Sequence, residues 1–139
     1  MADRTVSLKL MSDIDQIDGV SAALEGAMRD HGFGDEDILD TQLAVEEAVT
    51  NIILHGYEKT PGEISVQIRA TRGMVEIQLE DTAPPFDPLS LPEPDIAGEI
   101  EDRKIGGLGI FLIRQVMDDI VYRYEDGKNV LVLVKRRAA

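Results

Sequence analysis

The stretch AVEEAVTNIILHGYE, Ala44–Glu58, decides how the chain folds and raises the question of what it does. Apolar residues recur in it at helical spacing, which predicts a long helix from about Glu36 to Leu54. Glu47, Asn51 and His55 follow one another at steps of four, so an acid, an amide and an imidazole lie along one line of that helix. Such a line of polar groups has either to face solvent or to meet a ligand.

The side of the helix that carries Glu47 is not plainly a solvent face. At about 100° per residue, Asn51 lies roughly 40° from Glu47, and His55 lies roughly 80° from it. Leu43 and Leu54 flank Glu47 within roughly 40° on the same side. The opposite side carries an ordinary apolar core stripe, which consists of Ile38, Val45, Val49 and Ile52. Two interpretations stay open: the wall of a ligand cleft, or a solvated polar stripe that ends with the helix.

Outward from this helix, the sequence alternates between strand and helix patterns. The chain has 139 residues, which predicts a single domain over residues 1–139. Helical spacing recurs over residues 14–28 and in GGLGIFLIRQVMDDI, and strand alternation occurs over residues 6–10, 64–70 and 75–79 and twice in IVYRYEDGKNVLVLVKR. The order β-α-α-β-β-α-β-β predicts an α+β fold, a two-layer sandwich with helices on one face of a mostly antiparallel mixed β-sheet.

One long segment breaks this periodicity. Five of the six prolines lie between Asp81 and Ile105. A long irregular insertion in a compact domain is often a functional lid, so a lid is predicted at about residues 82–106.

Composition excludes several classes of function. The chain has 14 Lys and Arg against 27 Asp and Glu, a formal net charge of −13, which argues against direct binding to nucleic acid or anionic membranes and favours either solubility or a basic partner. It has no cysteine, which excludes disulfides, thiolate chemistry and a Cys-based zinc site, and its two histidines, His31 and His55, are too few for a His-rich metal cage. No run approaches 18 apolar residues, so a soluble cytoplasmic protein is predicted.

The segment LEDTAPPFDP is a second candidate site. Asp81 ends a predicted strand, where an acceptor-only carboxylate can read an exocyclic amine such as adenine N6. Ala83 is small enough to let a planar base approach, and Phe86 can cover an apolar pocket. The alternative is a proline-rich turn that Asp81 caps.

The segment RKIGGLGIF is a third candidate site. Gly106, Gly107 and Gly109 precede or open a helix, where glycine permits close backbone approach and free N–H groups attract phosphate. Arg103 and Lys104 have the right charge for a polyphosphate. The alternative is a flexible hinge. No Walker A lysine follows, so this is not a P-loop.

Together the three segments resemble a known set. EEAVTNIILHGY is similar to the N-box of the GHKL ATPase superfamily, and EDTAPPFDP and IGGLGIFLI are similar to its two glycine boxes. The nearer resemblance is to the anti-sigma-factor serine kinases of bacterial partner-switching systems, and it runs from the first strand to NVLVLVKR. It implies a Bergerat-type ATP-binding fold with ATP and Mg²⁺ as cofactors.

The resemblance also implies roles for individual residues. Glu47 would be the general base, Asn51 the Mg²⁺ ligand and Asp81 the adenine reader. Ala83 and Phe86 would lie beside the adenine ring. The phosphates would be held by Arg103, Lys104, Gly106, Gly107, Leu108 and Gly109.

The chain departs from the family pattern in both glycine boxes. Ala83 and Pro85 replace the two glycines of the usual Asp-x-Gly-x-Gly, and Ile105 stands where a glycine often opens the second box. An alanine at positive φ would be strained by roughly 1 kcal/mol. Either the turn after Asp81 differs from the family's turn, or the pocket is tighter.

These residues lead to one main hypothesis and its alternatives. The chain is predicted to be an ATP/Mg²⁺-dependent serine-protein kinase that phosphorylates an anti-sigma-factor antagonist, a small protein with a phosphoacceptor serine, and sequesters a sigma factor or another effector. The first alternative is a nucleotide-gated partner-binding regulator without kinase activity. The second, a small-molecule hydrolase, gives Asp81 and the glycine cluster no role. A homodimer is implied by resemblance only.

Overall fold

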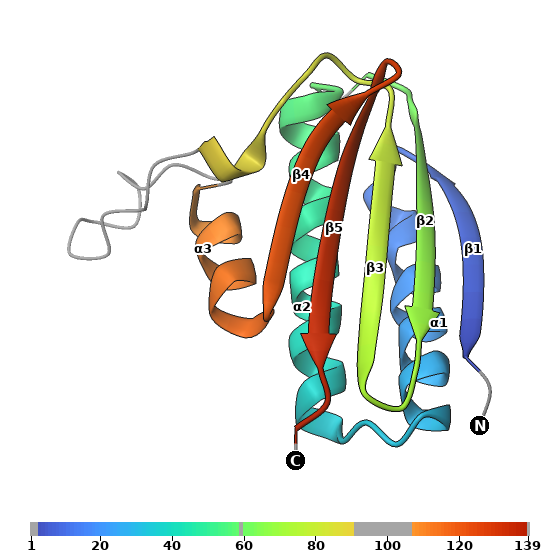
Figure 1. Ribbon diagram of the computed structural model, residues 1–139. Coiled ribbons are helices and arrows are strands. Elements are labelled where there is room, and N and C mark those ends of the chain that lie inside the picture. Colours follow the sequence, from blue (N-terminus) through green and yellow to red (C-terminus); the bar gives the residue numbers. More distant parts are fainter. Residues whose placement is uncertain (1–2, 59, 91–106, 139) are drawn as a thin grey trace.

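The computed structural model describes residues 3–58, 60–90 and 107–138. The main elements, in chain order, are β1 (Arg4–Met11), α1 (Ile17–Asp30), α2 (Asp35–Asn51), β2 (Glu63–Ala70), β3 (Met74–Asp81), α3 (Gly107–Val116), β4 (Asp119–Glu125) and β5 (Lys128–Arg136). Short 3₁₀ turns cover Ile14–Gln16 and Pro88–Ser90, and a π-helical turn covers Ile52–Gly56. The predicted order of helices and strands is confirmed (Figure 1).

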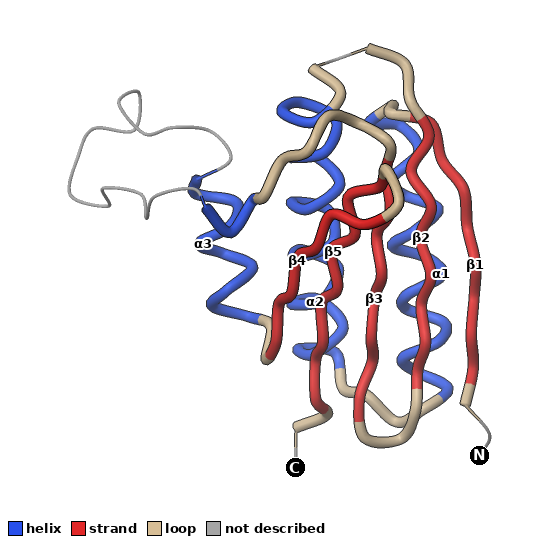
Figure 2. The backbone as a smooth tube through the Cα atoms, turned by 45° about the horizontal axis from the view of Figure 1, so that its top comes forward, coloured by secondary structure: helices blue, strands red, loops and turns tan. Residues whose placement is uncertain are grey.

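The five strands form one sheet in the order β1-β2-β3-β5-β4, and each neighbouring pair is antiparallel. Figure 1 shows α1 and α2 behind this sheet and α3 beside α2 at the β4 edge, and Figure 2 shows the same separation of the red strands from the blue helices. The predicted two-layer α+β sandwich is therefore confirmed, and all pairs of its described strands are antiparallel.

The core lies between the two layers. Strand alternation turns every second side chain toward the helices. In β2 these inward residues are Ile64, Val66, Ile68 and Ala70, and all four are buried. The predicted apolar stripe of α2 is buried as well, so this side of α2 forms part of the core.

The turn between β4 and β5 fixes the register of these two strands, in which Glu125 pairs with Lys128. Asp126 and Gly127 both have positive φ, at 53° and 77°. Two left-handed residues form the tight hairpin turn whose twist matches that of the flanking strands, and Asp and Gly adopt this conformation at the lowest cost. On its other side β5 pairs with β3, and that pairing places Asn129 opposite Asp81 on the helix-facing side of the sheet.

A buried polar cluster closes the N-terminal end of α2. The Asp37 carboxylate accepts a hydrogen bond from Ala138 N–H at 3.0 Å. Lys135 Nζ donates to the Val116 carbonyl at 2.7 Å and lies 4.0 Å from Asp37 Oδ1 and 3.8 Å from Asp40 Oδ2. This cluster ties the end of β5 and the end of α3 to the first turn of α2.

Two predictions remain to be compared with the structure, the lid and the absence of a membrane-spanning segment. The predicted lid at residues 82–106 is described only as far as residue 90, and residues 91–106 lie outside the described residues. In the described part of the chain, no helix combines the length and the apolar character needed to cross a membrane.

Candidate functional site

The helix that carries the polar line changes its winding just after Asn51. The predicted α-helix over Glu36–Leu54 is wrong in its last turn, because Ile52–Gly56 forms a π-helical turn. Its wider winding changes the angle at which His55 leaves the helix, and the His55 ring packs against Phe86 with ring centroids 6.0 Å apart. Such π turns inside helices are frequent at functional sites.

A pocket opens beside this turn, between α2, the end of β3, α3 and the start of β5 and β4. Its polar lining consists of Asn51, Asp81, Tyr122 and Asn129. Its remaining walls are formed by Ala48, Ile52, Gly56, Phe86, Pro88, Ile110 and Leu131. Mostly apolar walls with a few polar groups are typical of a site for a small organic ligand.

Asn51 brings an unmet hydrogen-bonding requirement to the pocket. The residue is 4% exposed, and its amide nitrogen is buried without a partner among the described residues. An unpaired buried polar group costs about 1–3 kcal/mol, which a ligand can offset. The other atom of the same amide, its oxygen, is a ligand type that Mg²⁺ accepts.

A metal at Asn51 would need ligands from elsewhere. The described residues contain no group of three or more His, Asp or Glu side chains that could hold a metal ion. Mg²⁺ commonly takes one or two protein ligands and completes its shell with water and phosphate oxygens. The residues present therefore fit Mg²⁺ that arrives with a polyphosphate.

Asp81 presents the pocket with a carboxylate that is used on one side only. Its Oδ1 accepts hydrogen bonds from Ala83 N–H at 3.0 Å and from Asn129 Nδ2 at 2.9 Å. Its Oδ2 receives no donor from the described part of the chain. Burial raises the pKa of the Asp81 carboxyl above its ordinary value, and the two hydrogen bonds partly offset that rise. One acceptor oxygen is thus free for a ligand.

The turn after Asp81 carries Ala83 and Pro85 where the family pattern has glycine. Among the described non-glycine residues, positive φ occurs only at Glu58 and Asp126, so Ala83 carries no left-handed strain. Ala83 is 3% exposed and packs beneath the turn, close to Gly56, rather than lining the pocket. The strain expected for an alanine at positive φ is therefore absent at Ala83.

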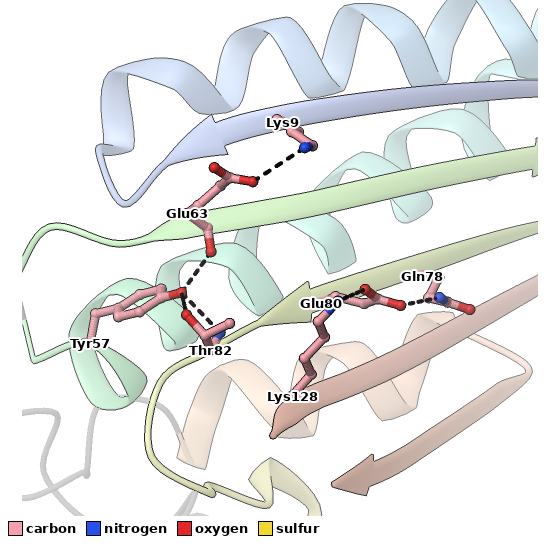
Figure 3. Close-up of polar contacts among 7 residues, drawn as sticks. All are labelled: Lys9, Tyr57, Glu63, Gln78, Glu80, Thr82 and Lys128. Atoms are coloured by element: carbon pink, nitrogen blue, oxygen red, sulfur yellow. Dashed lines mark hydrogen bonds and ion pairs between the residues drawn. The ribbon is translucent and has the colours of Figure 1, made fainter. Parts of the chain in front are cut away.

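Tyr57 supports this turn from the helix side, as Figure 3 shows. Its hydroxyl donates to the Glu63 carbonyl at 2.6 Å and accepts from Thr82 N–H at 3.0 Å. A Cβ at Gly62 would lie 2.2 Å from the Tyr57 ring, so only glycine fits beside it. Tyr57 thereby joins the end of the π turn to the start of β2 and to the residue after Asp81.

The sequence analysis assigned no role to Tyr57 or to Asn129. Asn129 is 5% exposed and bonds directly to Asp81. A signal in the sequence was present for Asn129 only. Asn129 is a polar residue at an inward position of the apolar strand NVLVLV, whereas Tyr57, two residues after His55, lies off the line of Glu47, Asn51 and His55.

Glu47 lies at the edge of the site rather than in it. It is half-buried, it does not line the pocket, and it forms no ion pair or hydrogen bond with another described residue. Glu46, which points away from it, accepts a hydrogen bond from Ser21 Oγ of α1 at 3.0 Å. Glu46 is therefore a half-buried contact between two helices and not a free surface carboxylate.

The predicted phosphate-binding residues are described in part. Gly107, Leu108 and Gly109 form the first turn of α3, whose later residue Ile110 lines the pocket. The start of α3 is therefore near the pocket, as a phosphate site at a helix N-terminus requires. Arg103, Lys104 and Gly106 lie outside the described residues.

Comparison with known sequences places these features in context. Residues 10–135 match the family described as "Histidine kinase-like ATPase domain". The chain is 30% identical over 131 residues to the protein named "Serine-protein kinase RsbW" of Bacillus thuringiensis (strain Al Hakam), which covers 91% of this chain and 82% of that relative. The protein of the same name from Bacillus cereus (strain 03BB102) matches equally well.

A solved structure has a similar fold. The crystal structure of the RsbU and RsbW domains of Rv1364c from Mycobacterium tuberculosis superposes with a TM-score of 0.66 at 20% sequence identity. The match covers 96% of this chain and 32% of that longer chain. At this identity the likeness supports the fold alone.

Proposed function

The chain belongs to the histidine kinase-like ATPase domain family, and on that premise we propose that it uses Mg²⁺-ATP to phosphorylate a serine of a small antagonist protein. The relatives that it matches over most of their length carry the name serine-protein kinase. The resemblance to anti-sigma-factor kinases extends the proposal to a regulatory role. The chain would hold a sigma factor or another effector and exchange it for the antagonist according to its nucleotide state.

One observation carries the nucleotide part of this proposal. A single pocket contains Asn51, whose buried amide nitrogen lacks a partner, and Asp81, whose second oxygen lacks a donor among the described residues. Both groups are more than nine-tenths buried. An adenine amine and a metal-bound polyphosphate are the kinds of group that would satisfy them.

Each residue then has a proposed role in phosphoryl transfer. Asp81 accepts from the adenine amine, Asn51 holds Mg²⁺, and the first turn of α3 faces the phosphates. Bound Mg²⁺ would neutralise charge on the phosphates, which is the main requirement of this reaction besides positioning. Glu47 would accept the proton of the attacking serine hydroxyl. The roles of Arg103, Lys104 and Gly106 rest on the resemblance.

A second candidate function has one observation in its favour. Glu47 does not line the pocket and makes no hydrogen bond there with the described residues. If the general base does not reach the bound nucleotide, the chain would bind ATP and switch partners without transferring phosphate. That is the nucleotide-gated regulator without kinase activity.

Phosphate transfer from γ-labelled ATP separates the two candidates. The protein is incubated with labelled Mg²⁺-ATP and the small proteins that co-purify with it from its own cell, and serine phosphate is identified by acid hydrolysis. The kinase proposal predicts labelled serine on one small protein, and no transfer when Mg²⁺ is chelated. Saturable ATP binding without any transfer to a bound partner would instead support the binding regulator.

A further inference from the structure

Asn129 makes more hydrogen bonds around the pocket than its position on a strand requires. Its Nδ2 donates to Asp81 Oδ1 at 2.9 Å, to the Ala83 carbonyl at 3.0 Å and to the Pro84 carbonyl at 3.2 Å. Its Oδ1 accepts from Phe86 N–H at 3.1 Å and from the Tyr122 hydroxyl. Acceptors surround one end of the amide and donors the other, so the amide has only one orientation that satisfies them.

These contacts fix the two oxygens of Asp81 in different roles. Oδ1 is occupied by two N–H donors, from Asn129 and from Ala83, whereas Oδ2 has none among the described residues. Rotation of the carboxylate would break both hydrogen bonds to Oδ1, so its plane is held in one orientation. We propose that Asn129 is a positioning residue that leaves Oδ2 of Asp81 as the free acceptor and thereby sets the preference of the pocket for adenine over guanine.

This inference rests on the proposed nucleotide function and adds the residue that controls base selectivity. A free acceptor oxygen matches the exocyclic amine of adenine, which is a donor. The corresponding group of guanine is a carbonyl oxygen, which would face the carboxylate with no hydrogen between them. A buried polar group left without a partner costs about 1–3 kcal/mol, so discrimination of roughly 5- to 150-fold is expected from this one contact.

The same geometry fixes the orientation of the new amide in the variant Asp81→Asn. The new side chain has one acceptor, its oxygen, and two N–H donors still converge on the Oδ1 position. The amide oxygen therefore takes that position, and its NH₂ group takes the position of Oδ2. The pocket then offers a donor where it offered an acceptor, so the variant is expected to prefer GTP. Without Asn129 the amide is held by Ala83 N–H alone, and that preference should shrink.

Tyr57 supplies the matched control. It also supports the turn that follows Asp81, but through Thr82 N–H, and it does not touch the Asp81 carboxylate. Loss of its hydroxyl weakens the turn without changing which oxygen of Asp81 is free. A role of Asn129 that was only structural would be shared by Tyr57.

The experiment measures affinities for Mg²⁺-ATP and Mg²⁺-GTP by calorimetry on five proteins. These are the unmodified chain, Asn129→Ala, Tyr57→Phe, Asp81→Asn and the double variant Asp81→Asn/Asn129→Ala. Circular dichroism checks that each is folded, and Asn129→Ser, which retains one donor, replaces Asn129→Ala if the latter does not fold. The quantity compared is the ratio of the ATP affinity to the GTP affinity.

We expect the ratio to fall at least about fivefold in Asn129→Ala and to stay within twofold of the unmodified value in Tyr57→Phe. Asp81→Asn should reverse the ratio, and the double variant should bring it close to one. An unchanged ratio in folded Asn129→Ala, or an equal fall in Tyr57→Phe, would overturn the inference while leaving the nucleotide function in place. An unmodified chain that binds neither nucleotide would instead overturn the proposed function itself.

Discussion

The two ends of helix α2 carry buried polar clusters that differ in how completely they are paired. At the N-terminal end, the Asp37 carboxylate accepts from Ala138 N–H and lies beside Lys135, and Thr41 Oγ donates to the Asp37 carbonyl at 2.8 Å. At the C-terminal end, Asn51 Nδ2 and His55 Nε2 have no hydrogen-bond partner among the described residues. Among the fully buried side-chain nitrogen and oxygen atoms of the described part of the chain, these are the only two without a partner.

The difference separates a structural cluster from a binding site. Buried polar groups are nearly always hydrogen-bonded in folded proteins, and an exception calls for a physical reason. In the closed cluster at Asp37 the buried polar groups are paired with one another, so its role is to stabilise the fold. The open cluster at Asn51 keeps a requirement that a ligand can meet, and it adjoins Asp81, which has an unused acceptor.

The largest effect is expected at the edge of the open cluster, in Glu47→Ala. General-base contributions are typically about 10²- to 10⁴-fold, so serine phosphorylation should fall by that factor. Nucleotide binding should be retained, because Glu47 does not line the pocket. Initial rates of phosphate transfer to the antagonist protein provide the measurement.

Glu46→Ala is the matched control for this change, because it removes the same charge from the neighbouring position. Glu46 points toward α1, where it accepts from Ser21 Oγ. Its loss should lower stability slightly and leave the rate of transfer within a few-fold. Equal rates in Glu47→Ala and the unmodified protein would remove Glu47 from the mechanism, and equal damage from both variants would indicate a general electrostatic effect.

The second effect concerns Asn51→Ala. Removal of the amide should lower Mg²⁺-dependent ATP affinity by about 5- to 150-fold, the equivalent of about 1–3 kcal/mol for a lost buried contact. The fold should persist, because the unpaired amide nitrogen stabilises nothing in the free protein. Calorimetry with and without Mg²⁺ measures the affinity. Unfolding of the variant, seen by circular dichroism, would assign Asn51 to the core instead.

The closed cluster predicts the opposite outcome for Asp37→Ala. The change leaves Ala138 N–H without its acceptor and removes the carboxylate beside Lys135. Urea unfolding should therefore show that the free energy of unfolding falls by about 1–3 kcal/mol. The ratio of ATP to GTP affinity should be unchanged. A variant of normal stability but altered nucleotide preference would show that the two clusters are not separate in function.

The smallest effect is a dependence of stability on pH at Asp81. Burial raises the folded-state pKa of this carboxyl above its ordinary value of 3.8, so the folded protein holds its proton more readily than the unfolded chain does. Stability contributed by Asp81 is therefore lost as the pH rises from 3.8 through the raised folded pKa. Asp81→Asn has no such proton, so its stability relative to the unmodified protein should increase across that interval. Urea unfolding at a series of pH values measures the difference, which would stay constant if Asp81 did not titrate in this way.

The fold could be predicted from the sequence because its signals are local. Alternation in β2 and β3, the Asp126–Gly127 turn and the apolar stripe of α2 each specify one element, and their order specifies the two layers. The π turn over Ile52–Gly56 was missed, because apolar spacing over five residues does not distinguish it from an α-helical turn.

The site could be predicted less completely, because its support comes from contacts distant in the chain. Asn51 and Asp81 were identified by residue type and position, and the structure places both in one pocket. Asn129 lies 48 residues from Asp81, and Tyr57 lies 25 residues from Thr82. Their roles depend on strand register and on the path of the turn, and no local pattern in the sequence records either.

The stability gained on adding Mg²⁺-ATP tests the contrast between the two ends of α2 most directly. A ligand at about 100 times its Kd adds about 2.7 kcal/mol to a protein that binds it. Thermal melts should show the full rise in Tm for the unmodified protein, the same rise from a lower starting point for Asp37→Ala, and a much smaller rise for Asp81→Asn. An Asp81→Asn protein that ATP stabilises as much as the unmodified chain, or an unmodified chain that ATP does not stabilise, would contradict the assignment of the open cluster as the nucleotide site.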